Sequence, residues 1–183
     1  MMNLSNWTLD AIRSSDFDGI TMKWLEERRS EWVGLLGLRL RYFLNGASFV
    51  LICDEEREWF EKYFLLNINK ANLARPFLPF ISLHSLYPRI NEINIKDELA
   101  LLQDMLSISF PNGYMYFYVG KGSSKLSLIA KSSNNSYMWL FDEQAQNSFY
   151  LNSQDNFLDI KLLSLFKLFD KSLSEILLGR VSL

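Results

Sequence analysis

The amino-acid sequence predicts an α/β fold: a three-layer, doubly wound parallel sheet of about five strands with helices on both faces. Continuous apolar runs such as residues 47–53, with turn residues at each end, are typical of strands buried on both faces. Between these runs, apolar residues recur every three or four positions, as in amphipathic helices. Strands that alternate with helices favour a parallel sheet. The 183 residues contain no linker, repeat or low-complexity tail, so we expect a single domain, 1–183.

The first third of the chain is expected to form three helices and one strand. The helices are predicted over residues 4–15, 21–44 and 54–66, and the strand over residues 47–53. Thr21 is a suitable N-cap for the long second helix, and Asn45 with Gly46 supplies its end. The arginines of this helix, Arg39 among them, alternate with glutamates in a pattern typical of a solvated face.

The rest of the chain is expected to complete the sheet and its covering helices. Strands are predicted over residues 77–83, 114–119, 137–141 and 149–151, and helices over residues 95–108, 126–131 and 157–178. Pro79 lacks a backbone N–H, which places the first of these strands near an edge of the sheet. In the last helix, apolar residues from Leu158 to Ile176 share one face.

Charge and composition restrict the class of protein. With 19 basic and 21 acidic residues the formal charge is −2, so the basic excess of a domain that grips DNA phosphates is missing and we expect no direct nucleic-acid binding. One cysteine and one histidine exclude an internal disulfide and a Cys/His zinc site. No secretory signal is visible, and the longest uncharged apolar stretch, residues 42–53, is too short to span a membrane. We therefore expect a cytoplasmic protein with no membrane contact.

Residues that follow the predicted strands are the candidates for a ligand site, because ligands of open parallel sheets lie beyond the carboxyl ends of the strands. Asp54, Glu55 and Glu56 follow the first strand, where a phosphate-binding fold would place Gly and Ser. We expect these acids to satisfy the N-terminus of the next helix. The alternative is a metal-binding or general-base carboxylate at Asp54.

Two other strand ends carry candidate groups. His84 has the pKa of an acid–base group, but only the nearby Ser82 and Ser85 mark it, and Cys53 is more simply a small buried side chain. We therefore expect no catalytic residue, metal or cofactor. The segment Gly120–Ser124 has the composition of a phosphate cradle, although it matches neither the Walker nor the G-x-G-x-x-G spacing and also suits an ordinary turn. It keeps open an alternative function, the binding or isomerisation of a sugar phosphate.

Short segments in collinear order, nearly all after the first 20 residues, carry a resemblance to a known family. They are Trp24–Arg28, Leu44–Ser48, Trp59–Phe60, Asn67, Asn69, Arg75–Pro76, Tyr87–Pro88, Val119–Lys121, Trp139–Phe141, Leu158–Asp159, Lys161–Leu163, Leu165–Phe169, Val181 and Leu183. In these segments the chain resembles the HobA family of replication initiation regulators from relatives of Helicobacter and Campylobacter. The resemblance implies a sugar-isomerase-like fold, assembly as a homotetramer (a dimer of dimers), and binding of the N-terminal domain of DnaA. It implies a non-enzymatic role in gathering DnaA at the replication origin.

Two surfaces are predicted for the implied contacts. A DnaA-binding surface needs a few apolar anchors with a polar rim. Candidates at the two ends of the chain are Trp7, Asp10, Ile176, Leu177 and Leu178. The subunit contact is expected on the second apolar line of the long helix, at Trp24, Leu35, Leu38 and Tyr42. Packing of the same side chains inside their own subunit is the alternative for both sets.

Overall fold

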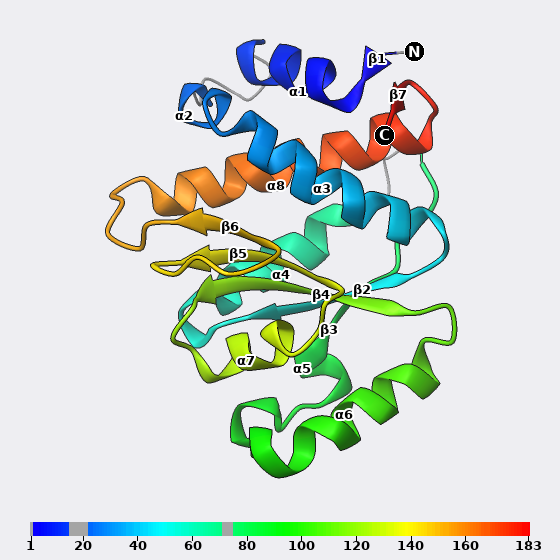
Figure 1. Ribbon diagram of the computed structural model, residues 1–183, viewed down its shortest axis with the longest axis vertical. Helices are drawn as coiled ribbons and strands as arrows, with labels where there is room; N and C mark the ends of the chain where they lie inside the picture. The colour runs from blue at the N-terminus through cyan, green and yellow to red at the C-terminus, as the bar shows by residue number, and fades with distance from the viewer. Residues whose placement is uncertain (1, 15–21, 71–74) are drawn as a thin grey trace.

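The computed structural model describes residues 2–14, 22–70 and 75–183, and a parallel sheet lies at its centre (Figure 1). The strands are β2 (Ser48–Cys53), β3 (Phe80–Ser82), β4 (Tyr114–Lys121), β5 (Ser136–Phe141) and β6 (Ser148–Leu151). Their order is β3-β2-β4-β5-β6, and every neighbouring pair is parallel. The predicted α/β class and its five-stranded parallel sheet are therefore confirmed.

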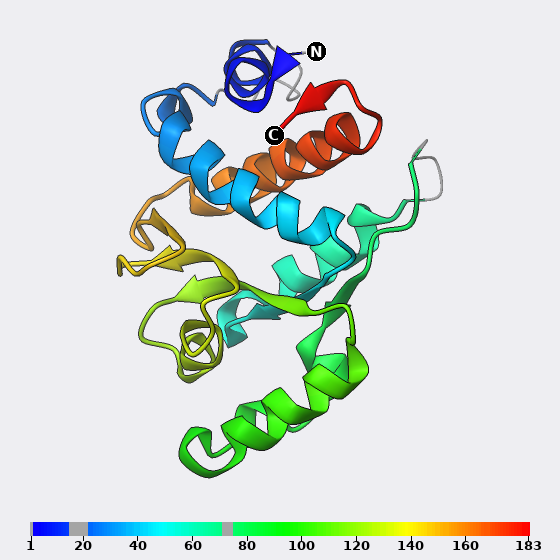
Figure 2. The same cartoon turned by 45° about the vertical axis from the view of Figure 1, so that its right-hand side comes forward.

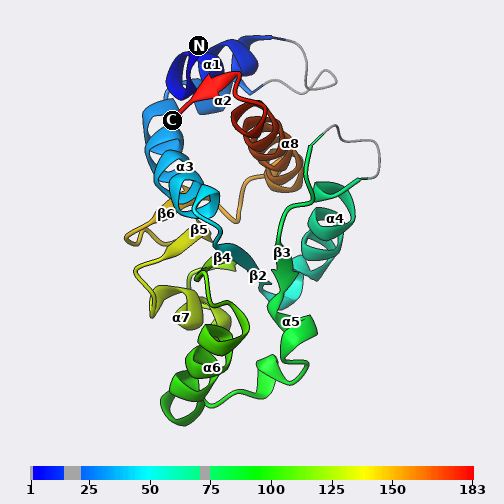
Figure 3. The same ribbon diagram turned by 90° about the vertical axis from the view of Figure 1, so that its right-hand side faces the viewer.

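Helices cover both faces of this sheet (Figure 3). One face carries α3 (Arg29–Leu44), α4 (Glu58–Ile68) and α8 (Leu158–Leu177), and the other carries α5 (Leu83–Leu86), α6 (Ile95–Ser109) and α7 (Lys125–Lys131). The helix α1 (Leu4–Arg13) contacts α3 and α8 from outside, so that α1 and α6 stand at opposite ends of the molecule (Figure 2). The doubly wound arrangement is as predicted.

Alternate side chains of the strands enter two separate hydrophobic cores. In β4, Met115, Phe117 and Val119 face the core beneath α3, α4 and α8, whereas Tyr116 and Tyr118 face the core beneath α6 and α7. Every residue of β5 is buried, as a strand covered on both faces requires. Much of the 15% aromatic content lies in the first core, where rings pack edge to face around Phe117.

The helix predicted over residues 21–44 is in fact two helices. The short helix α2 (Lys23–Glu26) ends before Arg28, and α3 begins at the next residue. Contacts with β6 stabilise the break: the Arg28 guanidinium lies 3.9 Å from the centroid of the Phe149 ring, and its Nη1 donates a 2.7 Å hydrogen bond to the carbonyl oxygen of Tyr150. The expected end at Asn45 and Gly46 is confirmed, whereas the N-cap predicted at Thr21 lies outside the described residues.

Arg39 is not on a solvated face, contrary to the sequence-based expectation. The residue is only 8% exposed, and its Nε donates a 2.8 Å hydrogen bond to the carbonyl oxygen of Ser136 at the start of β5. Arg39 stands three residues after Leu36 and four before Phe43, and both of these are buried. Residues three and four apart are neighbours on a helix, so the helical spacing itself places this arginine on the buried side of α3.

Several element boundaries differ from the prediction. The strand expected over residues 77–83 is reduced to β3 at the sheet edge, because the Ser82 hydroxyl accepts the backbone N–H of Ser85 and so begins α5. The 3-10 turns η1 (Glu55–Arg57) and η2 (Ile90–Glu92) precede α4 and α6. The strands β1 (Met2–Asn3) and β7 (Val181–Ser182) form a separate parallel pair that is too short to leave a periodic signal. Within the described ranges, no helix is long and apolar enough to cross a membrane.

Candidate functional site

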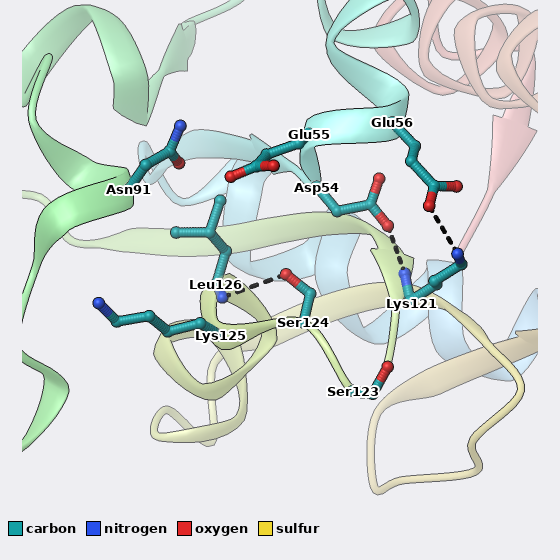
Figure 4. Close-up of a pocket in the computed structure, with 9 residues that line it drawn as sticks. All are labelled: Asp54, Glu55, Glu56, Asn91, Lys121, Ser123, Ser124, Lys125 and Leu126. Atoms are coloured by element: carbon teal, nitrogen blue, oxygen red, sulfur yellow. Dashed lines mark hydrogen bonds and ion pairs between the residues drawn. The ribbon is translucent and has the colours of Figure 1, made fainter.

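The carboxyl ends of β2 and β4 lie side by side at the centre of the sheet. From β2 the chain passes to β3 on one side and then to β4 on the other side of β2, so the strand order reverses between β2 and β4. Such a reversal is the usual ligand site of an open parallel sheet. Here a cavity of about 300 Å³ opens between the acidic residues 54–56 and the loop that carries Lys121, Ser123 and Ser124 (Figure 4).

Asp54 occupies the place where an anionic ligand would bind. The residue is 5% exposed, and its Oδ2 accepts a 2.7 Å hydrogen bond from the backbone N–H of Lys121 (Figure 4). Burial raises the pKa of the Asp54 carboxyl, and the bond from Lys121 and the charge of Arg57 oppose that rise. Asp54 stands at the N-cap position of η1, and Glu55 and Glu56 lie in its first turn, as expected, but the Asp54 side chain makes no capping hydrogen bond there and reaches β4 instead.

The polar groups of the loop after β4 form hydrogen bonds within the loop and with the start of α7. The Ser124 hydroxyl accepts the backbone N–H of Leu126 and thereby caps α7, while the Ser127 hydroxyl donates to the carbonyl oxygen of Gly122. The ammonium group of Lys121 lies 2.6 Å from Glu56 Oε1. A phosphate cradle offers unpaired backbone N–H groups to its ligand, whereas the N–H groups of Lys121, Gly122 and Ser124 already donate to acceptors within the chain. The geometry of the segment is that of a strand-to-helix turn.

The second candidate, His84, belongs to a polar cluster that the sequence analysis did not find. Its Nδ1 lies 3.3 Å from Oε2 of Glu61, a buried residue of α4, and its Nε2 lies 3.4 Å from Asn91 Oδ1. The Ser82 hydroxyl donates to Glu61 rather than to His84, so among the described residues no serine is paired with the imidazole as a nucleophile. Cys53 is fully buried, and burial raises the pKa of its thiol well above the ordinary value. The cluster therefore lacks an activated nucleophile.

Glu61 could have been found by its spacing. It stands three residues before Phe64 and seven before Ile68, and all three are buried on one side of α4. A carboxylate at an apolar position of a helix wheel indicates a buried polar contact. In the sequence, Glu61 lies among the aromatic residues whose spacing predicts this helix, and an acid in such a run gives no signal of its own to the helical pattern.

The ion pair between Glu61 and His84 predicts a pH dependence of stability. The hydrogen bond to Glu61 is the main cause that raises the pKa of His84 above its ordinary 6.5, against the opposing effect of burial. Since the raised pKa belongs to the folded state, the stabilisation is complete below the unfolded pKa of about 6.5 and is lost as the pH rises through the folded pKa. We expect the free energy of unfolding, measured in urea, to fall over that interval in the wild type. In His84→Gln this part of the fall should be absent. An identical pH profile for both proteins would contradict the prediction.

Most of the side chains predicted for the subunit contact pack against the core of their own subunit. Trp24 lies on α2, where its ring packs 6.5 Å from that of Phe149 and below the ammonium group of Lys161. Leu35 and Tyr42 are half-buried against the first core, whereas Leu38 is 62% exposed. Of the four predicted side chains, only Leu38 stands fully on the surface of α3.

The two helices that carry the predicted DnaA anchors contact each other at one end of the molecule. The helix α1, which carries Trp7 and Asp10, contacts both α8 and β7, so the two ends of the chain are adjacent (Figure 1). Trp7, Ile176 and Leu177 are partly buried against the first core, while Asp10 is exposed and Leu178 is 43% exposed. Elements far apart in the sequence that carry apolar and acidic candidates thus lie at the same end of the molecule.

In the described part of the chain, no group of three or more His, Cys, Asp or Glu side chains is arranged to hold a metal ion. Two of the acids after β2, Asp54 and Glu56, are bound to Lys121 through its backbone N–H and its ammonium group respectively. These two carboxylates at the strand ends therefore form hydrogen bonds within the chain.

Comparison with known proteins gives one consistent result. The family model described as HobA, DNA replication regulator, matches residues 1–183. The DNA replication regulator protein HobA of Helicobacter pylori is 34% identical over 188 residues, which cover 100% of both chains. A crystal structure of a complex between Helicobacter pylori HobA and domains I–II of DnaA is similar with a TM-score of 0.74 and 32% identity over 100% of both chains. A crystal structure of Helicobacter pylori HobA has a TM-score of 0.77 at 31% identity and covers 100% of this chain and 99% of its own.

Proposed function

This chain belongs to the HobA family of DNA replication regulators, and we propose that it acts by binding the N-terminal domain of DnaA and gathering DnaA molecules at the replication origin. One observation carries the proposal: a similar HobA, aligned over the full length of this chain, was crystallised with domains I–II of DnaA. The similarity extends over 100% of both chains at 32% identity.

The proposed role is non-enzymatic and cytoplasmic. Support comes from the strand ends, where Asp54 binds the backbone N–H that a phosphate ligand would use. It also comes from the His84 cluster, where no serine is paired with the imidazole. The formal charge of −2 fits a protein that reaches DNA through DnaA rather than by direct phosphate contacts.

Self-association would give this role its physical basis. We propose a homotetramer, a dimer of dimers, with the exposed part of α3 around Leu38 in the subunit contact. Several weak sites on one rigid assembly raise the effective concentration of the bound partner. DnaA molecules held in this way would meet one another at the origin more often than free molecules.

We place the DnaA contact on the surface formed by α1 and the end of α8. This surface is supported by its composition: Trp7 and the exposed Asp10 are three residues apart on α1, and the apolar Leu178 stands at the end of α8, which α1 contacts. Interfaces concentrate their binding energy in a few such apolar anchors with polar neighbours. Leu178 is the anchor most accessible to a partner, at 43% exposed.

Size-exclusion chromatography with light scattering tests both parts of the proposal. The protein alone should elute with the mass of an oligomer, and it should gain mass when the N-terminal domain of its own DnaA is added. Leu178→Asp should weaken that binding at least about tenfold, because a charged side chain opposes burial of the anchor. Ile108→Asp, on the exposed side of α6 at the opposite end, is the matched control and should bind normally. An unchanged mass with DnaA would refute the proposal.

The alternative function, binding of a sugar phosphate in the loop Gly120–Ser124, makes the opposite prediction. A ligand of the folded state raises the melting temperature by mass action. Because the backbone N–H groups of Lys121, Gly122 and Ser124 are already bound, glucose 6-phosphate and fructose 6-phosphate should leave the melting temperature unchanged. A concentration-dependent rise with either compound would restore the alternative.

A further inference from the structure

The cavity between the carboxyl ends of β2 and β4 is lined by acidic and basic side chains, and two of its acids are already paired. Asp54 Oδ1 lies 3.8 Å from Nη1 of Arg57, which is buried like Asp54 itself. Glu56 Oε1 lies 2.6 Å from the ammonium group of Lys121. These four side chains carry two negative and two positive charges, which cancel. The binding properties of the cavity therefore depend on its remaining charged side chains.

Glu55 and Lys125 are those remaining side chains, and they line the cavity from different elements (Figure 4). Glu55 belongs to η1 after β2, whereas Lys125 is the first residue of α7 after the loop. Both are exposed, and within the described part of the chain neither forms an ion pair. In the view of Figure 4 the Leu126 side chain lies between them. One free carboxylate, one free ammonium group and one apolar side chain thus line the same space.

The size, position and charge of this cavity restrict the class of ligand. Its volume of about 300 Å³ is at the lower end of the range of about 300–1,000 Å³ for small-molecule sites. It lies where the strand order reverses, the usual position of a ligand in an open parallel sheet. A ligand with a single charge would pair with only one of the two free side chains, and a phosphate would be repelled by Glu55. A small molecule that carries both an ammonium group and a carboxylate complements both side chains.

We propose that this cavity binds a free amino acid with an apolar side chain. The ammonium group of the ligand pairs with Glu55, its carboxylate pairs with Lys125, and its side chain lies against Leu126. Two charge-assisted contacts at opposite ends of a small molecule fix its orientation as well as its position. The inference goes beyond the proposed DnaA contact, because none of the described residues that line the cavity belongs to α1 or α8.

Isothermal titration calorimetry with L-leucine, on the full chain without DnaA, tests the proposal. Two analogues each lack one charge: N-acetyl-L-leucine has no ammonium group, and L-leucinamide has no carboxylate. The wild type should bind L-leucine with a dissociation constant below about 10 mM. It should bind each analogue at least about tenfold more weakly, a difference of about 1.4 kcal/mol. Glycine, which lacks the apolar side chain, should also bind more weakly than L-leucine.

Variants of the two free side chains give matched outcomes. Lys125→Gln should weaken the binding of L-leucine at least about tenfold and leave that of L-leucinamide unchanged, because the amide has no carboxylate to lose. Glu55→Gln should weaken L-leucine to the same extent and leave N-acetyl-L-leucine unchanged. Both side chains are exposed, so neither change disturbs the core. Lys96→Gln and Asp104→Asn, exposed on α6 and outside the cavity lining, are the controls and should bind as the wild type does.

Three results would overturn the inference. The first is no binding of L-leucine up to about 10 mM. The second is binding of N-acetyl-L-leucine or of L-leucinamide as tight as that of L-leucine, which would assign the cavity to simple anions or cations. The third is binding of L-leucine that Lys125→Gln or Glu55→Gln retains, which would place the ligand elsewhere. The mass gained with DnaA is measured separately, so a failure of the proposed DnaA contact leaves this test unaffected.

Discussion

Arg75→Ala is expected to lower the free energy of unfolding by about 3–5 kcal/mol, the usual cost of removing one partner of a buried ion pair. The Arg75 side chain is 2% exposed and pairs with Asp170 of α8. Its Nη1 also donates to the carbonyl oxygen of Asp170 at 2.9 Å and to the Ser174 hydroxyl at 2.7 Å, and its Nη2 donates to the carbonyl oxygen of Ile68. One side chain thus joins α4, α8 and the segment before β3.

The loss of Arg75 would leave Asp170 without its counter-charge. Burial already raises the pKa of the Asp170 carboxyl, and Arg75 is the main influence that opposes the rise. Urea unfolding followed by circular dichroism measures the change. Arg89→Ala removes an ion pair with Glu92 in which both side chains are largely exposed, so this control should unfold like the wild type. A loss below about 1 kcal/mol for Arg75→Ala would show that the network contributes little.

Gly120→Ala is expected to cost about 3 kcal/mol of folding free energy and to disturb the end of β4. A Cβ on residue 120 would lie 2.5 Å from Asp54 Oδ2 and 2.8 Å from the Tyr118 hydroxyl, and its φ of +155° is a conformation that L residues rarely adopt. The added methyl group would force Asp54 away from the backbone N–H of Lys121. Thermal and urea unfolding of the purified variant measure the loss.

Two further variants separate crowding from backbone strain at residue 120. Gly179 has a φ of +69°, and a Cβ there would meet nothing within 4 Å, so Gly179→Ala carries strain alone and should cost about 1 kcal/mol. In the background of Asp54→Ala, the crowding carboxylate is gone and the Tyr118 hydroxyl remains close, so the added effect of Gly120→Ala should be smaller than in the wild type. Equal costs for Gly120→Ala and Gly179→Ala would mean that close packing on Asp54 does not constrain the site.

The sequence predicted where the candidate site lies but not how its side chains are paired. The sequence places Asp54 and the segment Gly120–Ser124 at the ends of parallel strands, and that rule brings them to one edge of the sheet. It does not reveal the hydrogen bond from Lys121 to Asp54, because that bond depends on the register that pairs Cys53 with Val119. The acids were therefore expected to cap a helix, and only the packed strands show that Asp54 is bound to the neighbouring loop.

Surface and interior polar residues were the least predictable from the sequence. Arg39 and Glu61 occur at helix positions beside apolar residues, yet composition alone presents them as ordinary members of charged segments. The predicted contact residues Trp24 and Trp7 fit either a core or an interface, because large aromatic side chains dominate both. The structure places both tryptophans partly against the first core, and their roles in binding remain predictions.

The sequence by itself determined the α/β class, the five-stranded parallel sheet and most of the helices, because apolar periodicity is a local property of the chain. Only the tertiary structure decided how the polar groups are paired. The bond from Lys121 to Asp54 spans 67 residues, that from Arg75 to Asp170 spans 95, and that from Arg39 to Ser136 spans 97. Such pairs form only when distant strands and helices are packed at a defined register. Local sequence patterns therefore do not identify which polar groups end up bound to one another and which, like Arg39, still lack a counter-charge.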